Sequence, residues 1–198
     1  MKNQLLLVNK EGKVENRLYS VLPKEEIFDE SWLQKLLISS PELLPVHEID
    51  PACSRLIPIG RQIHVESGII DHLYITPEGF ICLVETKLWR NPESYRAAAA
   101  QLVDYAKDLS KLSLDEFKRI TGMDQPELER KVQESLKNGR FLLLLVTDRI
   151  TPKMTEIVEG MRSVSDLRFG IRAIELQAFK RSKEATWPLL IVPKVARR

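Results

Sequence analysis

The length, composition and charge of this chain are those of an ordinary globular protein. It has 198 residues, of which 43% are hydrophobic and 29% are charged, and its formal net charge is +2. These values exclude a predominantly disordered chain, and they give no bulk electrostatic sign of a nucleic-acid-binding protein. No segment reaches the roughly 20 apolar residues of a membrane-spanning helix, and we expect no secretory leader. From these two expectations we predict a cytoplasmic protein in which Cys53 and Cys82 are reduced. The two cysteines also lack the spacing of metal ligands.

The first predicted element is a β-hairpin over residues 4–21. Two apolar stretches flank the sequence NKEGK there, and this sequence has the composition of a tight turn. We expect this hairpin, within residues 1–24, to be an attachment to a single domain formed by residues 25–198.

The second predicted element is a helix that begins after Asp29. Apolar side chains recur at helical spacing from Trp32 onward, and aspartate favours the N-cap position of helices. Pro41 and Pro45 limit the helix, because proline breaks the helical hydrogen-bond ladder.

Residues 54–88 have the composition of β-strands, and the turn sequence TPEG divides their second half. Because this turn is short, we expect strands 69–76 and 80–88 to pair antiparallel. A helix follows, with Asn91 suited to its N-cap and Pro92 to its first turn. The remaining predicted elements are two short helices within 113–138, a buried strand at 141–148, a helix capped by Thr151, and closing strands at 169–179 and 188–195. This order predicts an α/β fold, with a mixed sheet flanked by helices.

Charged residues interrupt two of these apolar strands. Since side chains alternate along a strand, Glu85 and Lys87 share one face with Leu83, and Asp71 shares a face with Ile69, Leu73 and Ile75. Pairing of the strands would bring Asp71 near Glu85, which is unfavourable unless a cation lies between them. Each residue alone suits a solvated strand end or a structural ion pair. The three together favour a site for a hard divalent cation.

These residues resemble the PD-(D/E)XK nuclease superfamily, also called restriction-endonuclease-like. The similarity lies in residues 68–106, with Asp71, the Glu85-x-Lys87 pair at the end of the next strand, and a helix that carries Gln101. Ile70 stands where the family pattern has proline. The element order through residue 148 suits the α-β-β-β-α-β core of this family.

The resemblance implies a Mg²⁺-dependent nuclease, with Mn²⁺ as an alternative ion and DNA as the expected substrate. Asp71 and Glu85 would bind the ion, and the carbonyl group of Thr86 would be a further ligand. Lys87 would position or activate the attacking water. Gln101 would face the site from the helix and orient Lys87 or the phosphate.

The resemblance leaves one catalytic acid open. Glu30 fits the start of the first helix, and Glu42 and Glu48 are the alternatives. Arg90 and Arg96 are candidates for contacts with the phosphate backbone, although each also suits an ordinary solvated helix start. Many relatives act as dimers, so a homodimer is among the expected assemblies.

Two other functions remain open at this point. The chain suits a nucleic-acid-binding domain of the same fold without catalytic activity, or an α/β interaction domain in which the acids and Lys87 form a structural cluster. No phosphate-binding loop, dinucleotide-binding fingerprint, zinc signature or serine-hydrolase motif supports another enzyme class.

Overall fold

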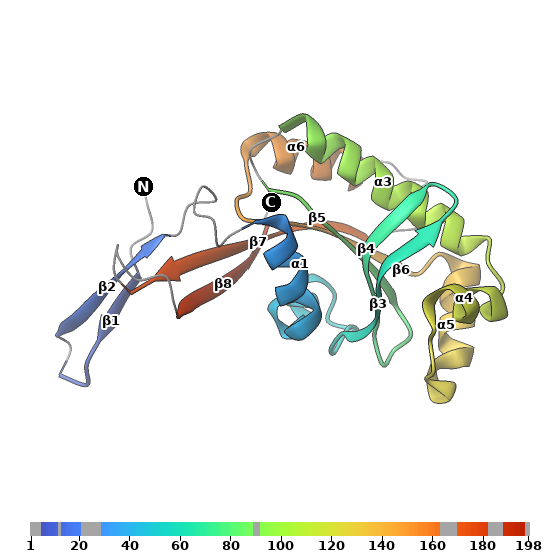
Figure 1. The fold of residues 1–198 in the computed structure, drawn as a ribbon, viewed down its shortest axis with the longest axis horizontal. Coiled ribbons are helices and arrows are strands. Elements are labelled where there is room, and N and C mark those ends of the chain that lie inside the picture. The colour runs from blue at the N-terminus through green and yellow to red at the C-terminus, as the bar shows by residue number, and fades with distance from the viewer. Residues whose placement is uncertain are drawn as a thin grey trace.

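The computed structural model describes residues 5–11, 13–20, 29–88, 92–162, 170–181 and 188–196 (Figure 1). Its elements, in chain order, are β1 (Leu5–Val8), β2 (Val14–Ser20), α1 (Glu30–Ser39), the 3-10 helix η1 (Pro41–Leu43), α2 (Val46–Ile49), β3 (Ile57–Val65), β4 (Gly68–Ile75), β5 (Ile81–Thr86), α3 (Pro92–Ser110), α4 (Leu114–Thr121), the 3-10 helix η2 (Pro126–Leu128), α5 (Glu129–Asn138), β6 (Phe141–Thr147), α6 (Pro152–Arg162), β7 (Gly170–Lys180) and β8 (Leu189–Val195).

The strands form one mixed sheet of eight strands, in the order β1-β2-β7-β6-β5-β4-β3, with β8 paired to β7. The central pairs β5–β6 and β6–β7 are parallel, whereas β3–β4, β4–β5 and β7–β8 are antiparallel. Parallel strands need a crossover connection, and α3 through α5 supply it between β5 and β6. The predicted mixed sheet flanked by helices is therefore confirmed, as is the antiparallel pairing of β4 with β5.

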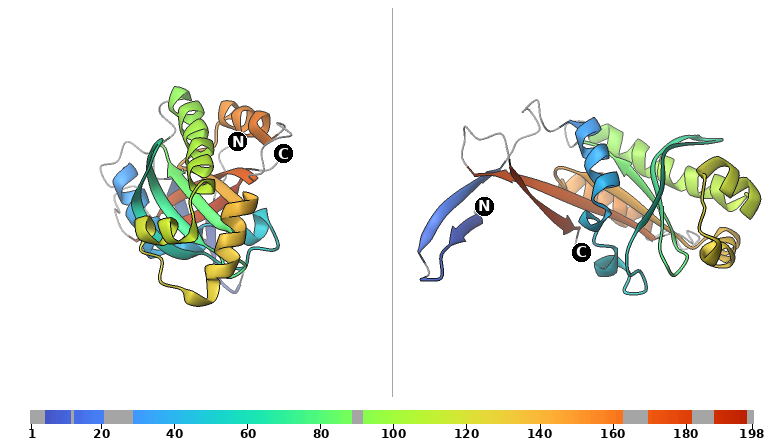
Figure 2. Two further views of the ribbon diagram at one scale, coloured as in Figure 1. Left: turned by 90° about the vertical axis from the view of Figure 1, so that its right-hand side faces the viewer. Right: turned by 60° about the horizontal axis from the view of Figure 1, so that its bottom comes forward.

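Helices cover both faces of the sheet (Figures 1 and 2). On one face, a large apolar core joins β3–β7 to α3, α4, α5 and α6. On the other face, a second core joins α1, η1 and α2 to β4–β7. The central strands β5 and β6 are buried along their whole length, because each is covered on both sides.

The N-terminal hairpin extends the sheet away from the helices (Figure 1). Its strand β2 pairs with the end of β7, through Tyr19 opposite Lys180 and Ser20 opposite Phe179. The side chain of Asn9 organises the turn, because its Oδ1 accepts from the backbone N–H groups of Glu11 and Lys13. The hairpin prediction is thus confirmed, and the hairpin is continuous with the main sheet through β7.

The predicted helix caps of α1 and α6 are present. The Asp29 carboxylate accepts from the backbone N–H of Trp32 at 2.6 Å, and the Thr151 hydroxyl accepts from that of Met154 at 3.2 Å. Each cap satisfies a donor that the first turn of a helix leaves free. These caps fix where both helices begin.

Side-chain alternation is as predicted in β5 but not in β4. In β5, Leu83 faces the α3 side and Val84 faces the α1 side. In β4, Ile69 is 40% exposed, whereas Ile70 is fully buried in the core on the α3 side. The expectation that Ile69 belongs to the apolar face was therefore wrong. The alternation breaks opposite Gln62 of the paired strand, whose φ of 53° is unusual for a non-glycine residue.

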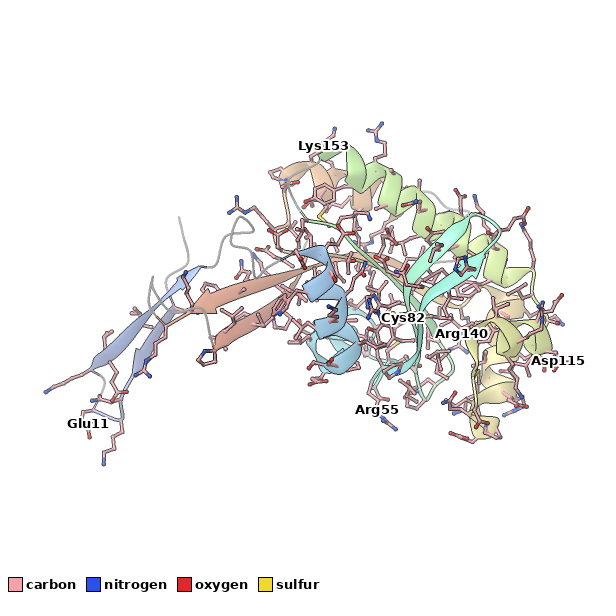
Figure 3. All side chains as sticks on the ribbon, in the orientation of Figure 1. Glu11, Arg55, Cys82, Asp115, Arg140 and Lys153 are labelled. Atoms are coloured by element: carbon pink, nitrogen blue, oxygen red, sulfur yellow. The ribbon has the colours of Figure 1, made fainter. Side chains whose placement is uncertain are left out.

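Both cysteines are free and buried, and Figure 3 shows Cys82 among the packed interior side chains. Burial raises the pKa of the Cys53 thiol to about 11 and holds that of Cys82 well above its ordinary value. Such thiols are unreactive at neutral pH. Within the described part of the chain, every helix is too short or too polar to span a bilayer.

The turn between β4 and β5 depends on Gly79. Its φ is +89°, and an added Cβ would lie 2.4 Å from the Cβ of Lys131, whereas at Gly122, with a φ of +70°, a Cβ would meet nothing within 4 Å. We expect Gly122→Ala to lower the free energy of unfolding by about 1 kcal/mol through backbone strain alone. Gly79→Ala adds a steric clash, and we expect a loss of about 3 kcal/mol. Urea denaturation measures both values, and equal losses would contradict the clash.

Candidate active site

The candidate site lies at the carboxyl end of β5. The Glu85 side chain is 5% exposed, and its Oε1 lies 3.1 Å from the Nζ of Lys87. Lys87 directly follows β5, and its backbone N–H donates to the carbonyl group of Val146 in β6 at 2.9 Å. The neighbouring strand therefore fixes the backbone of Lys87, and the ion pair fixes its side chain.

The surroundings of Glu85 disfavour its charged form. Burial and, to a smaller extent, the negative charge of Asp71 raise the pKa of Glu85 to about 7, although Lys87 opposes both effects. Its second oxygen, Oε2, is buried without a hydrogen-bond partner among the described residues. Burial alone would lower the pKa of Lys87, but the charges of Glu85 and Glu30 raise it above its ordinary value. Lys87 is therefore an ammonium group at neutral pH.

Asp71 is nearly buried, at 8% exposure, and is held by several hydrogen bonds. Its Oδ2 accepts from the backbone N–H of Thr86 at 3.0 Å and from the Thr86 hydroxyl at 2.8 Å. Its Oδ1 accepts from the Nε2 of Gln62 at 3.3 Å. The register of β4 and β5 ends at His72 opposite Val84, so Asp71 and Glu85 are the next residues along the two strands.

Among the three candidate acids of the first helical region, Glu30 is the one that contacts this cluster. Its Oε1 lies 3.4 Å from the Nζ of Lys87, and its side chain is 41% exposed. Glu42 lies in η1 and Glu48 in α2, and both are exposed. Glu30 is the first residue of α1, so the Asp29 cap that starts this helix also places the acid.

The structure places Gln101 at the surface. It is exposed, and no hydrogen bond between described residues joins it to Asp71, Glu85 or Lys87. The apolar stripe of α3 includes Leu102 and Tyr105, so the helix packs on the sheet through positions next to Gln101. The expectation that Gln101 faces the acids from the helix is therefore not matched by a contact.

The two arginines differ in what the structure shows. Arg90 lies outside the described residues. Arg96 is exposed and lines a shallow groove between α3 and α6, together with Lys153, Ile157 and Met161. Figure 3 shows Lys153 projecting from the first turn of α6. Arg96 thus belongs to the groove between the two helices, and no contact among described residues joins it to the acids.

Sequence reasoning missed three polar groups around Asp71: the Thr86 hydroxyl and the side-chain amides of Gln34 and Gln62. The only sequence signal for Gln34 was its position one helical turn after Glu30, which places both on one face of α1. Gln62 had no signal, because its orientation depends on the irregular backbone of β3.

The donor set fits a hard divalent cation. No group of three Asp, Glu, His or Cys side chains in the described residues is arranged as a metal cluster, so the candidate ligands to be considered are the two carboxylates of Asp71 and Glu85. Mg²⁺ is commonly bound through one or two carboxylates and keeps several waters. The Oε2 of Glu85 is buried, has no hydrogen-bond partner among the described residues, and could serve as a ligand atom near the charge of Asp71.

No protein-family model and no curated protein matches this chain. It is similar to the solved structure of a repair endonuclease from Pyrococcus abyssi, with 14% identity, a TM-score of 0.39, and coverage of 87% of this chain and 65% of that chain. A structure of an EndoMS–dsDNA complex shows 17% identity, a TM-score of 0.43, and coverage of 87% and 64%. SfsA from Pyrococcus furiosus in complex with Ca²⁺ shows 18% identity, a TM-score of 0.36, and coverage of 83% and 72%.

The chain thus spans just under two thirds of the length of the first two of these structures. The order of its own elements can be compared with the core expected from the sequence. A helix, three antiparallel strands, a crossover helix and a parallel strand follow one another from α1 to β6, and Asp71 and Glu85 lie on adjacent strands. This order matches the α-β-β-β-α-β core that the sequence resemblance predicts, within a mixed sheet flanked by helices.

Proposed function

We propose that this protein is a divalent-metal-dependent nuclease that hydrolyses phosphodiester bonds, with DNA as its substrate. The observation that carries the proposal is the placement of Lys87 between two acids, 3.1 Å from Glu85 and 3.4 Å from Glu30, at the end of a buried strand. Asp71, on the adjacent strand, supplies the second buried carboxylate. Two acids and an ammonium group at one strand end suit the hydrolysis of an anionic ester.

Asp71 and Glu85 would hold the ion, Mg²⁺ or Mn²⁺, and the Thr86 carbonyl group remains a proposed third ligand. A bound divalent ion supplies positive charge that offsets the negative charge developing on a phosphoryl group. Because its pKa is raised, Lys87 stays protonated at neutral pH, so it would orient the attacking water and stabilise negative charge by donating hydrogen bonds. Glu30 would hold Lys87 in place for this role.

A purely structural ion pair explains these residues less well. It accounts for the contact between Lys87 and Glu85. It leaves Asp71 close enough to raise the pKa of Glu85, and it leaves Oε2 of Glu85 without a partner in the part of the chain that the structure describes. Buried charges without compensation destabilise a fold, and a divalent ion would compensate both.

The proposal predicts nuclease activity that depends on a divalent ion. Plasmid, linear duplex and single-stranded DNA, with RNA as a comparison, would be incubated with the protein in Mg²⁺, in Mn²⁺ and in EDTA. We expect cleavage in one or both metals and none in EDTA. Without a bound cation, the carboxylates of Asp71 and Glu85 are anions that cannot offset the negative charge of a phosphate. Tight binding of DNA without cleavage in either metal would favour the inactive binding domain, and neither binding nor cleavage would contradict both functions.

A further inference from the structure

A chain of hydrogen bonds leads from β3 through α1 and β5 to Asp71. The Nη2 of Arg61 donates to the Oε1 of Gln34 at 3.4 Å, and the Nε2 of Gln34 donates to the Oγ1 of Thr86 at 3.1 Å. The Thr86 hydroxyl then donates to the Oδ2 of Asp71 at 2.8 Å. This series of hydrogen bonds connects residues far apart in the sequence, and it ends on Asp71, a proposed metal ligand.

The direction of this chain follows from the chemistry of its first member. A guanidinium group has donors only, so it requires the oxygen of the Gln34 amide to face Arg61. The amide nitrogen of Gln34 then faces Thr86, and the hydroxyl oxygen of Thr86 accepts from it. A hydroxyl has a single hydrogen, which is therefore left for Asp71.

The helix that carries Gln34 is fixed to the sheet at two further points. The backbone carbonyl group of Gln34 lies 2.8 Å from the Nε2 of the fully buried His72, and that of Leu37 accepts from the hydroxyl of Tyr74 at 3.0 Å. On the same face of α1, Glu30 contacts Lys87 one turn before Gln34. Helix α1 therefore contacts the candidate site at two points, through Glu30 at Lys87 and through Gln34 at Thr86.

We propose that Gln34 is a positioning residue, which keeps the Thr86 hydroxyl as a donor and so fixes the Asp71 carboxylate for a divalent cation. The inference rests on the proposed function. Gln62 donates directly to the other oxygen of Asp71, so Gln62 and, through Thr86, Gln34 constrain the two oxygens of the carboxylate. Groups that orient metal ligands in this way typically change metal affinity by about 10- to 100-fold when removed.

The test measures metal affinity apart from turnover. Mn²⁺ would be titrated into the metal-free protein, and free Mn²⁺ would be followed by its electron paramagnetic resonance signal. We expect Gln34→Met and Thr86→Val each to weaken Mn²⁺ binding by about 10-fold, and Thr86→Ser to retain nearly all of it. In the Thr86→Val background, Gln34→Met should have no further effect, because the two residues act through one hydroxyl.

Gln177→Met is the matched control. The Nε2 of Gln177 donates to the Oε1 of Glu175 at 2.6 Å. The same substitution there removes an amide–carboxylate hydrogen bond in β7 that is not part of the series from Arg61 to Asp71. We expect its Mn²⁺ affinity to equal that of the wild type. Thermal unfolding of every variant separates loss of metal affinity from loss of fold. If Gln34→Met unfolds, the comparison of Thr86→Val with Thr86→Ser still tests the proposal.

The outcomes distinguish the two proposals. A wild type that neither binds Mn²⁺ nor cleaves DNA would overturn the proposed function and this inference together. A wild type that binds Mn²⁺, with Gln34→Met and Thr86→Val at unchanged affinity, would overturn the role of Gln34 alone. Additive losses in the double variant would also overturn it, because they would show that Gln34 does not act through Thr86.

Discussion

Replacing Lys87 with alanine is expected to lower the rate of DNA cleavage by about 10³-fold, the largest effect that removal of a single charge-stabilising donor commonly has. Lys87 is the ammonium group that lies between Glu85 and Glu30, and its side chain is 26% exposed, so a substrate phosphate can reach it. Its raised pKa means that the wild-type side chain is charged throughout the neutral pH range. Single-turnover cleavage of a labelled duplex in Mg²⁺ measures the rate.

Lys118→Ala is the matched control for this substitution. Lys118 also forms an ion pair, with Glu129, but it does so between α4 and α5, away from the acids. We expect its cleavage rate to match that of the wild type. Thermal unfolding of both variants checks that the fold is intact. If Lys87→Ala cleaves at the wild-type rate, Lys87 has no role in the reaction, or the activity comes from a contaminating nuclease.

The second large effect is a pH-dependent loss of stability in the metal-free protein. The pKa of Glu85 is about 7 in the folded chain, against an ordinary value of 4.5, so the unfolded chain binds fewer protons between these pH values. The free energy of unfolding therefore falls as the pH rises through this window, and the loss is complete above pH 7. At 1.36 kcal/mol per pKa unit, the full loss is about 3 kcal/mol.

Glu85→Gln should remove this dependence, since glutamine does not titrate. Urea denaturation in EDTA at several pH values between about 4.5 and 8 would compare the variant with the wild type. We expect the difference between the two curves to grow by about 3 kcal/mol across this range, in favour of the variant. Parallel curves would contradict the raised pKa of Glu85.

The comparison isolates Glu85 from the other groups that titrate. Burial lowers the pKa of His72, so its contribution to stability increases as the pH rises, opposite in sign to that of Glu85. The contributions of Asp108 and Glu78, whose pKa values are lowered, are lost only in more acidic solution. All of these contributions are common to the wild type and the variant, and they cancel in the difference.

Much of the fold followed from local patterns in the sequence. The period-two alternation along β5 predicted a strand covered on both faces, and the structure buries all of it. The same alternation placed Glu85 and Lys87 together, because residues two apart on a strand share a face. Cap chemistry placed the starts of α1 and α6 at Asp29 and Thr151. These features depend on residues close in sequence, so the sequence by itself determined them.

The surroundings of Asp71 were decided only by the tertiary structure. The sequence could not choose Glu30 over Glu42 or Glu48, because the choice depends on how α1 packs against the sheet. It also could not show that Thr86 and Gln62 hold the Asp71 carboxylate, since the irregular backbone at Gln62 interrupts the alternation that sequence reasoning requires. Gln34 and Thr86 are 52 residues apart, and only the packing of helix on strand brings them into contact. Local periodicity assigns a side chain to a face, but its partners across the sheet depend on long-range packing.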